Sequence, residues 1–145
     1  MKNRKLLSLI MFLLALVLGV IFYFEIETPQ SLWGYFERTY LGQFGPLTIC
    51  VELLIAAYYL YIGHQKANFT LALFAFTVLL DIILSISGVF TSGVPIYGMV
   101  LFFITAIISL WISFTNAFEL GKITLGATLF SFVVGVAIEL YFNFV

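Results

Sequence analysis

Five long apolar runs, separated by short polar segments, organise the chain. Each run contains at most one charged residue. A helix needs about 20 predominantly apolar residues to cross the hydrocarbon layer of a membrane. The pattern therefore predicts an all-α fold, one domain over residues 1–145, with five transmembrane spans at residues 6–24, 46–62, 69–90, 95–118 and 123–144. Cleavage of the first run as a signal peptide would leave four spans, but no A-x-A-like site follows it.

Residues at the ends of these runs agree with helix boundaries. Pro46 and Pro95 stand at first-turn positions, where a missing backbone N–H costs nothing. Gly63 and Gly121 follow the second and fourth runs, as C-terminal glycine caps do. Asn68 is suited to cap the start of the third helix. The connections between most successive runs are short, which predicts antiparallel neighbours.

The longest connection, residues 25–45, carries an amphipathic stripe. Leu32, Phe36 and Tyr40 recur at helical spacing, and Trp33 stands beside Leu32. Tryptophan and tyrosine favour the headgroup layer of a membrane. We therefore predict a short helix that lies in the membrane interface and anchors the connection. A lid or a surface that docks a partner is the functional alternative.

Composition favours a membrane protein over a soluble one. Of the 145 residues, 63% are hydrophobic and 9% charged, whereas soluble domains have about 25% charged residues. The net charge of −1 argues against a nucleic-acid partner. Cys50 is the only cysteine and His64 the only histidine, which excludes an internal disulfide, a His/Cys zinc site and a haem with two histidine ligands. We expect no cofactor and find no motif typical of an enzyme.

Lysine and arginine residues lie mainly on one side of the predicted spans. With the N-terminus in the cytoplasm, only Arg38 falls on an outer segment. This distribution follows the positive-inside rule. We therefore predict a cytoplasmic N-terminus and an outer C-terminus, in the plasma membrane of a bacterium or archaeon. The basic residues on the inner segments are Lys2, Arg4, Lys5, Lys66 and Lys122.

Small and polar residues recur at helical spacing within each run. The last run carries Thr128, Ser131 and Gly135 ahead of Glu139. Apolar burial does not drive helices together in lipid, so small residues that permit close approach and hydroxyls that bond across the interface take that role. We expect these stripes to pack against neighbouring helices, while the leucine and phenylalanine faces meet the lipid bilayer.

Three acidic residues, Glu52, Asp81 and Glu139, interrupt the apolar runs, and no Lys, Arg or His within a run can pair with them. Helical rise places both glutamates roughly 8–10 Å below the outer boundary and Asp81 about halfway along its helix. An ionised acid at a helix centre costs about 2.5–3.5 kcal/mol. Keeping an aspartic acid neutral at pH 7 costs about 4 kcal/mol. Three arrangements are therefore open: protonated and hydrogen-bonded acids, a shared cation in a wet cavity, or pairing with basic groups of another chain.

These acids lead to two hypotheses of function, because ionisable residues inside a membrane mark functional sites by default. The first is an accessory or structural subunit that self-associates or packs into a larger membrane complex. The second is a proton- or cation-linked transporter or channel, with Asp81 as the central site and Glu52 and Glu139 in an outer vestibule. Acids that share a buried site favour transport, and acids exposed on one face favour a partner.

A purely structural role for the three acids is the remaining alternative. A protonated carboxyl group can join two helices through a hydrogen bond, without any transport or partner. Thr77, Ser85 and Tyr59 are the candidate bonding partners in the neighbouring sequence.

Overall fold

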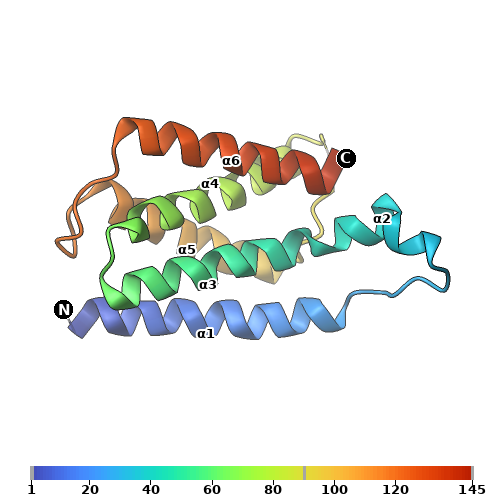
Figure 1. The fold of residues 1–145 in the computed structure, drawn as a ribbon, viewed down its shortest axis with the longest axis horizontal. Helices are drawn as coiled ribbons and strands as arrows, with labels where there is room; N and C mark the ends of the chain where they lie inside the picture. Colours follow the sequence, from blue (N-terminus) through green and yellow to red (C-terminus); the bar gives the residue numbers. More distant parts are fainter. Residues whose placement is uncertain (1, 90, 145) are drawn as a thin grey trace.

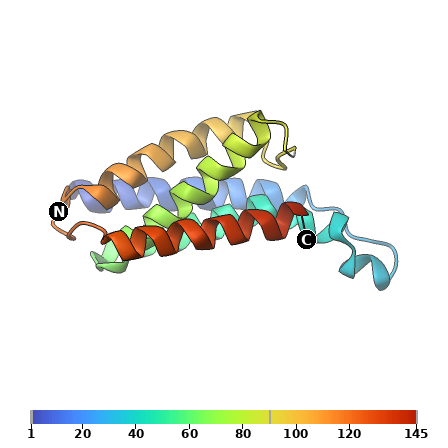
Figure 2. The same cartoon turned by 90° about the horizontal axis from the view of Figure 1, so that it is seen from above.

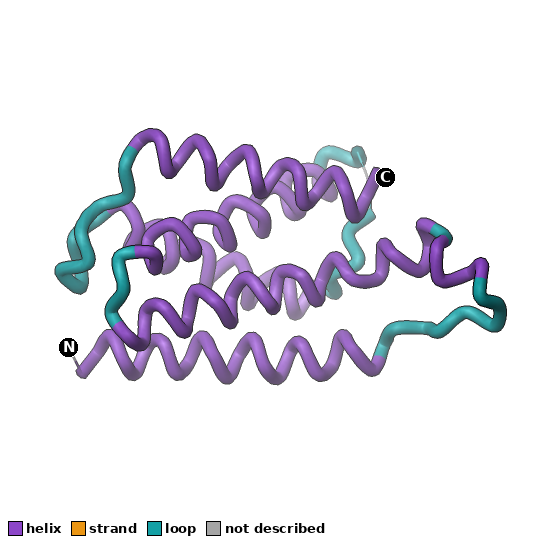
Figure 3. The backbone as a smooth tube through the Cα atoms, viewed as in Figure 1, coloured by secondary structure: helices purple, strands orange, loops and turns teal. Residues whose placement is uncertain are grey.

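The computed structural model describes residues 2–89 and 91–144, and all regular secondary structure in these residues is helical. Five long helices share one long axis (Figure 1), joined by the loops that Figure 3 shows. Each is long and apolar enough to cross a membrane. The predicted number and type of the long elements are therefore confirmed. They are α1 (Lys2–Phe24), α3 (Gly45–Ile62), α4 (Lys66–Ile86), α5 (Ile96–Phe114) and α6 (Leu125–Phe144).

Helix α4 lies at the centre of the bundle and packs against α3, α5 and α6, while α1 packs against α3. The buried rings of Phe22, Phe74 and Phe102 meet edge to face and join α1, α4 and α5. Two views show the chain termini at opposite ends of the long axis (Figures 1 and 2). Five successive helices of alternating direction produce this arrangement. It brings the start of α3 to the same end as the last turns of α4 and α6.

Two helices end earlier than the hydrophobic pattern predicts. Helix α4 ends at Ile86 rather than at residue 90, which lies outside the described residues, and α5 ends at Phe114 rather than at residue 118. The chain leaves the helical path at Gly88, whose φ of 80° is left-handed, and at Thr115, which is extended. Asp81 is consequently about 8 Å from the end of its helix, and the prediction that it lies halfway along is wrong.

The long connection does not form the single amphipathic helix that was predicted. A short 3₁₀ turn, η1 (Trp33–Phe36), is separated from a one-turn helix, α2 (Arg38–Leu41), by Glu37. Glu37 has an extended backbone, with φ −74° and ψ 146°, and this conformation interrupts the helical stripe. A second 3₁₀ turn, η2 (Gly42–Phe44), links α2 to α3, so the apolar stretch of α3 extends outward to Arg38.

The four residues of the predicted stripe consequently do not share one face. Leu32, Trp33 and Phe36 are exposed. Tyr40 instead turns its ring toward Phe44, with 5.2 Å between the ring centroids, and toward the equally close ring of Tyr35.

The predicted helix caps have mixed outcomes. Gly63 ends α3 with a left-handed φ of 73°, and Pro46 lies in the first turn of α3, as predicted. Pro95 immediately precedes the first residue of α5. Gly121 is left-handed but lies well beyond Phe114, so it does not cap α5. The capping role predicted for Asn68 is also wrong, because α4 already begins at Lys66.

Asn68 instead ties the start of α4 to the segment that follows α5. Its side chain is buried, and Nδ2 donates hydrogen bonds to the carbonyl oxygens of Leu120 (3.2 Å) and Gly121 (2.7 Å). The buried Ser113 hydroxyl donates to the carbonyl oxygen of Asn68 at 2.9 Å. These bonds fix the α5–α6 connection against α4 at the end of the bundle where α1 begins.

Replacing Asn68 with alanine should lower the free energy of unfolding by about 1–2 kcal/mol, because two carbonyl groups lose their donor. Thermal unfolding in detergent micelles measures the effect. Thr70→Ala is the matched control, since the Thr70 hydroxyl bonds only to carbonyl groups of its own helix. Equal destabilisation by the two substitutions would contradict the tethering role of Asn68.

Candidate functional site

The three predicted acids come together at one end of the bundle. Glu52 lies on α3, Asp81 on α4 and Glu139 on α6, and their exposed fractions are 7%, 6% and 5%. Counted from the ends of their helices at this side, all three lie about 8–10 Å deep at 1.5 Å per residue. They therefore form one layer near the C-terminus, instead of a central aspartate with a vestibule above it. We call these three residues the carboxyl cluster.

Glu139 is the meeting point of the carboxyl cluster. Its carboxyl group lies within hydrogen-bonding reach of the Asp81 carboxyl group, and the Glu52 carboxyl group is close enough to interact with it electrostatically. Ionised carboxylates are acceptors only. A hydrogen bond between Asp81 and Glu139 therefore requires that one of the two carry a proton.

Thr77 joins Glu52 to α4. Its Oγ1 lies 3.2 Å from Glu52 Oε1 and 2.9 Å from the carbonyl oxygen of Leu73, and the hydroxyl has a single proton for these two acceptors. Both contacts can be full hydrogen bonds when Thr77 donates to Leu73 and a protonated Glu52 donates to Thr77. The second oxygen, Glu52 Oε2, is buried without a hydrogen-bond partner.

Asp81 and Glu139 each accept a hydrogen bond from an uncharged donor. The Ser92 hydroxyl, in the connection between α4 and α5, donates to Asp81 Oδ2 at 2.5 Å. Asn143 Nδ2 donates to Glu139 Oε2 at 3.1 Å. Ser92 and Asn143 therefore hold the two carboxyl groups in place without neutralising a negative charge.

Gly135 explains how Glu139 comes so close to α4. A Cβ atom at this position would lie 3.3 Å from Thr77 Oγ1 and 3.4 Å from the Thr77 backbone nitrogen. The absence of a side chain lets the backbones of α4 and α6 approach closely. Glu139 follows Gly135 by one helical turn and Ser131, fully buried, precedes it by one, so all three lie on the face that packs against α4. Ser131 and Gly135 of the predicted stripe therefore pack against α4, whereas Thr128 is only partly buried and the hydroxyls of Thr128 and Ser131 bond to carbonyl groups of their own helix.

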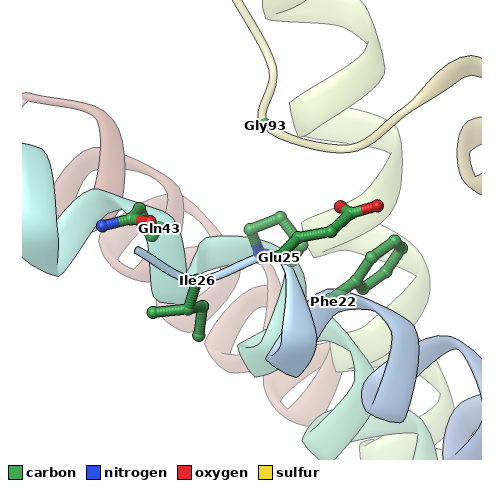
Figure 4. Close-up of a pocket in the computed structure, with 6 residues that line it drawn as sticks. Phe22, Glu25, Ile26, Gln43 and Gly93 are labelled. Carbon is green, nitrogen blue, oxygen red and sulfur yellow. The ribbon is translucent and has the colours of Figure 1, made fainter. Parts of the chain in front are cut away.

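A cleft of ≈ 150 Å³ opens at the same end of the bundle (Figure 4). Figure 4 shows the side chains of Glu25 and Gln43 pointing away from each other, with Gly93 across the cleft from them. We call this the outer cleft, because it lies at the end of the bundle that the sequence predicts to face outward. Its lining residues are Phe22, Glu25, Ile26, Gln43, Pro46 and Gly93.

The sequence identified the three acids and named Thr77 among their bonding partners, but it missed Ser92 and Asn143. Ser92 belongs to a connection and carries no periodic signal. Asn143 stands four residues after Glu139, a spacing that indicates a contact on one helix face. The residues of the predicted interfacial helix, Leu32 to Tyr40, are not part of the site.

The donor set of the site bears on which ion it could hold. Within the described part of the chain, no three His, Cys, Asp or Glu side chains are placed to hold a metal ion together.

Comparison of the chain with protein families, curated proteins and solved structures finds no match. The geometry of the site is therefore the basis for a proposal of function.

Proposed function

We propose that this chain is an integral membrane protein with five spans, a cytoplasmic N-terminus and an outer C-terminus. Large apolar side chains such as Leu13 on α1 and Val133 on α6 are exposed, as lipid contact requires. Arg4 and Lys5 lie at the end of the bundle where α1 begins, against the last turn of α3. Lys66 and Lys122 belong to the same end, which supports its assignment to the positive, cytoplasmic side.

We further propose that the carboxyl cluster binds and releases protons, as the central site of a proton-linked transporter or channel. The convergence of three buried carboxyl groups from three helices is the observation that carries this proposal. A hydrogen bond between Asp81 and Glu139 requires a proton on one of them, and a protonated Glu52 lets both contacts of Thr77 be full hydrogen bonds. The cluster suits protons better than a metal cation, because the other groups bonded to Asp81 and Glu139 are single uncharged hydrogen-bond donors, the Ser92 hydroxyl and the Asn143 amide.

Infrared spectroscopy of the reconstituted protein tests proton binding directly. A protonated carboxyl group in an apolar site has a C=O stretching band separate from that of a carboxylate. We expect this band in the native protein at neutral pH, and we expect it to weaken in Asp81→Asn and in Glu139→Gln. Glu119→Gln, at an exposed position near the opposite end, should leave the band unchanged. A native spectrum without this band would refute the proposal.

An accessory role in a larger membrane complex, or self-association, is a second candidate function. The acids do not support it, because the chain's own helices bury them. The supporting observation is an apolar groove of ≈ 390 Å³ between α1 and α3, lined in part by Gly19, into which side chains of a neighbouring helix could pack. Mass spectrometry of the protein released from lipid nanodiscs should then show a stable assembly that Gly19→Leu disrupts. A monomer carrying only lipid would contradict this role.

A further inference from the structure

We infer that the outer cleft is the path by which water and protons reach the carboxyl cluster, and that the Ser92 hydroxyl is the link between them. This inference rests on the proposed function of the cluster and adds the side and route of access. The starting point is a difference in exposure. The three acids are buried, whereas Ser92, directly bonded to Asp81, is only partly buried.

The position of Ser92 connects the cluster to the cleft along the chain. The next residue, Gly93, forms part of the cleft wall. The backbone N–H of Val94 donates a hydrogen bond to Ser92 Oγ at 3.1 Å and holds the hydroxyl in its orientation toward Asp81. The carboxyl group of Glu25 is able to bind water at the mouth of the cleft, whereas the amide of Gln43 is hydrogen-bonded to the backbone of Glu27.

A serine hydroxyl can pass a proton without a net change in itself. Its oxygen has two acceptor positions, of which the Val94 N–H occupies one. A hydronium ion that reaches Ser92 by way of the cleft can give a proton to Ser92 Oγ while Ser92 gives its own proton to the Asp81 carboxylate. One O–H bond breaks and one forms at serine, and the products are water, serine and protonated Asp81. Ser92→Ala removes the hydroxyl and therefore abolishes this proton exchange.

The width of the cleft at Gly93 is the feature that a substitution can change. A Cβ atom on Gly93 would lie 3.4 Å from Pro46 Cγ, in ordinary contact, so a longer side chain would extend into the space between the α4–α5 connection and α3. Gly126, on α6 near the opposite end, has no atoms within 4 Å of an added Cβ. Gly126→Leu is therefore a matched control for Gly93→Leu.

Hydrogen–deuterium exchange of the carboxyl C=O band measures access. After transfer to D₂O, we expect the carboxyl C=O band of Gly93→Leu to shift about tenfold more slowly than that of the native protein. With the cleft filled, the carboxyl protons exchange only when the structure around the cluster opens locally. Gly126→Leu should exchange at the native rate. Ser92→Ala should also exchange slowly, and Ser92→Thr, which keeps the hydroxyl, should restore the rate. Native exchange rates in both Gly93→Leu and Ser92→Ala would overturn the inference.

The two proposals fail in different ways in this experiment. A native protein without the protonated band refutes proton binding, whereas a band that exchanges equally fast in all variants refutes only the route. Should Gly93→Leu not fold, Gly93→Cys can be labelled after folding with a membrane-impermeant thiol reagent, since the one native cysteine, Cys50, is buried. Labelling should slow exchange, and an unchanged rate after complete labelling would also overturn the inference.

Discussion

Asp81→Asn should reduce proton flux through reconstituted liposomes to the level of liposomes without protein. Asparagine keeps the size of the side chain and can still accept the Ser92 hydrogen bond, but it can neither take up a proton nor release one. Because Asp81 contacts both Ser92 and Glu139, it is the step through which a proton from the outer cleft would reach the cluster. A pH-sensitive dye inside the liposomes, with a potassium diffusion potential as driving force, measures the flux.

The neighbours of Asp81 provide the controls for this prediction. Glu139→Gln should cause a loss similar to that of Asp81→Asn, and the double variant should be no worse than either, since residues that act as a unit give non-additive effects. Glu119→Gln, exposed near the opposite end of the bundle, should retain native flux. Native flux in Asp81→Asn would refute transport through the cluster. Loss of proton flux in Asp81→Asn but not in Glu139→Gln would show that the two carboxyl groups do not act as a unit.

The number of long helices could be predicted from the sequence because it depends on a signal that each run carries by itself. Hydrophobicity over about 20 residues identifies a helix able to span a membrane. The helix ends were less predictable. Apolar residues continue past Ile86 and Phe114, and only the backbone at Gly88 and Thr115 shows where the helical hydrogen bonds stop.

The three candidate acids can be recognised in the sequence, whereas their arrangement cannot. An acid within an apolar run is conspicuous at any position, so Glu52, Asp81 and Glu139 could be named individually. Their convergence depends on which helices are neighbours, and a single sequence does not contain that information. The hydrophobic pattern places Asp81 too deep because the apolar run continues past Ile86, where α4 ends. With the end of α4 at Ile86, Asp81 lies at about the same depth as Glu52 and Glu139, so all three acids form one layer.

The partners that position the acids were the hardest to predict. Ser92 lies in a connection, where no periodicity indicates the direction of a side chain, and its contact with Asp81 spans 11 residues of sequence across the end of α4. The predicted interfacial helix does not form, and the sequence could not indicate this for a related reason. Its apolar spacing is helical, but the extended backbone at Glu37 divides it, and four-residue elements are too short for side-chain pattern to determine the structure.

Gly135→Leu should destabilise the protein by about 3 kcal/mol and separate Glu139 from Asp81, because overpacking at a tight contact forces backbones apart. The added side chain would start only 3.3 Å from Thr77 Oγ1, and α4 is the main packing partner of α6. Thermal unfolding in detergent micelles measures stability, and the carboxyl C=O band reports on the acid pair in the same samples.

Gly126→Leu on the same helix separates packing from helix propensity. Both substitutions replace a helical glycine, which favours the helix by nearly 1 kcal/mol, but a Cβ atom added at Gly126 has no neighbouring atoms within 4 Å. We therefore expect Gly126→Leu to be neutral or slightly stabilising and to retain the native C=O band. If Gly135→Leu were equally harmless, the close approach of α4 and α6 would not be what brings Glu139 to Asp81. The carboxyl cluster would then require another cause, such as the contact of η2 with the last turns of α6.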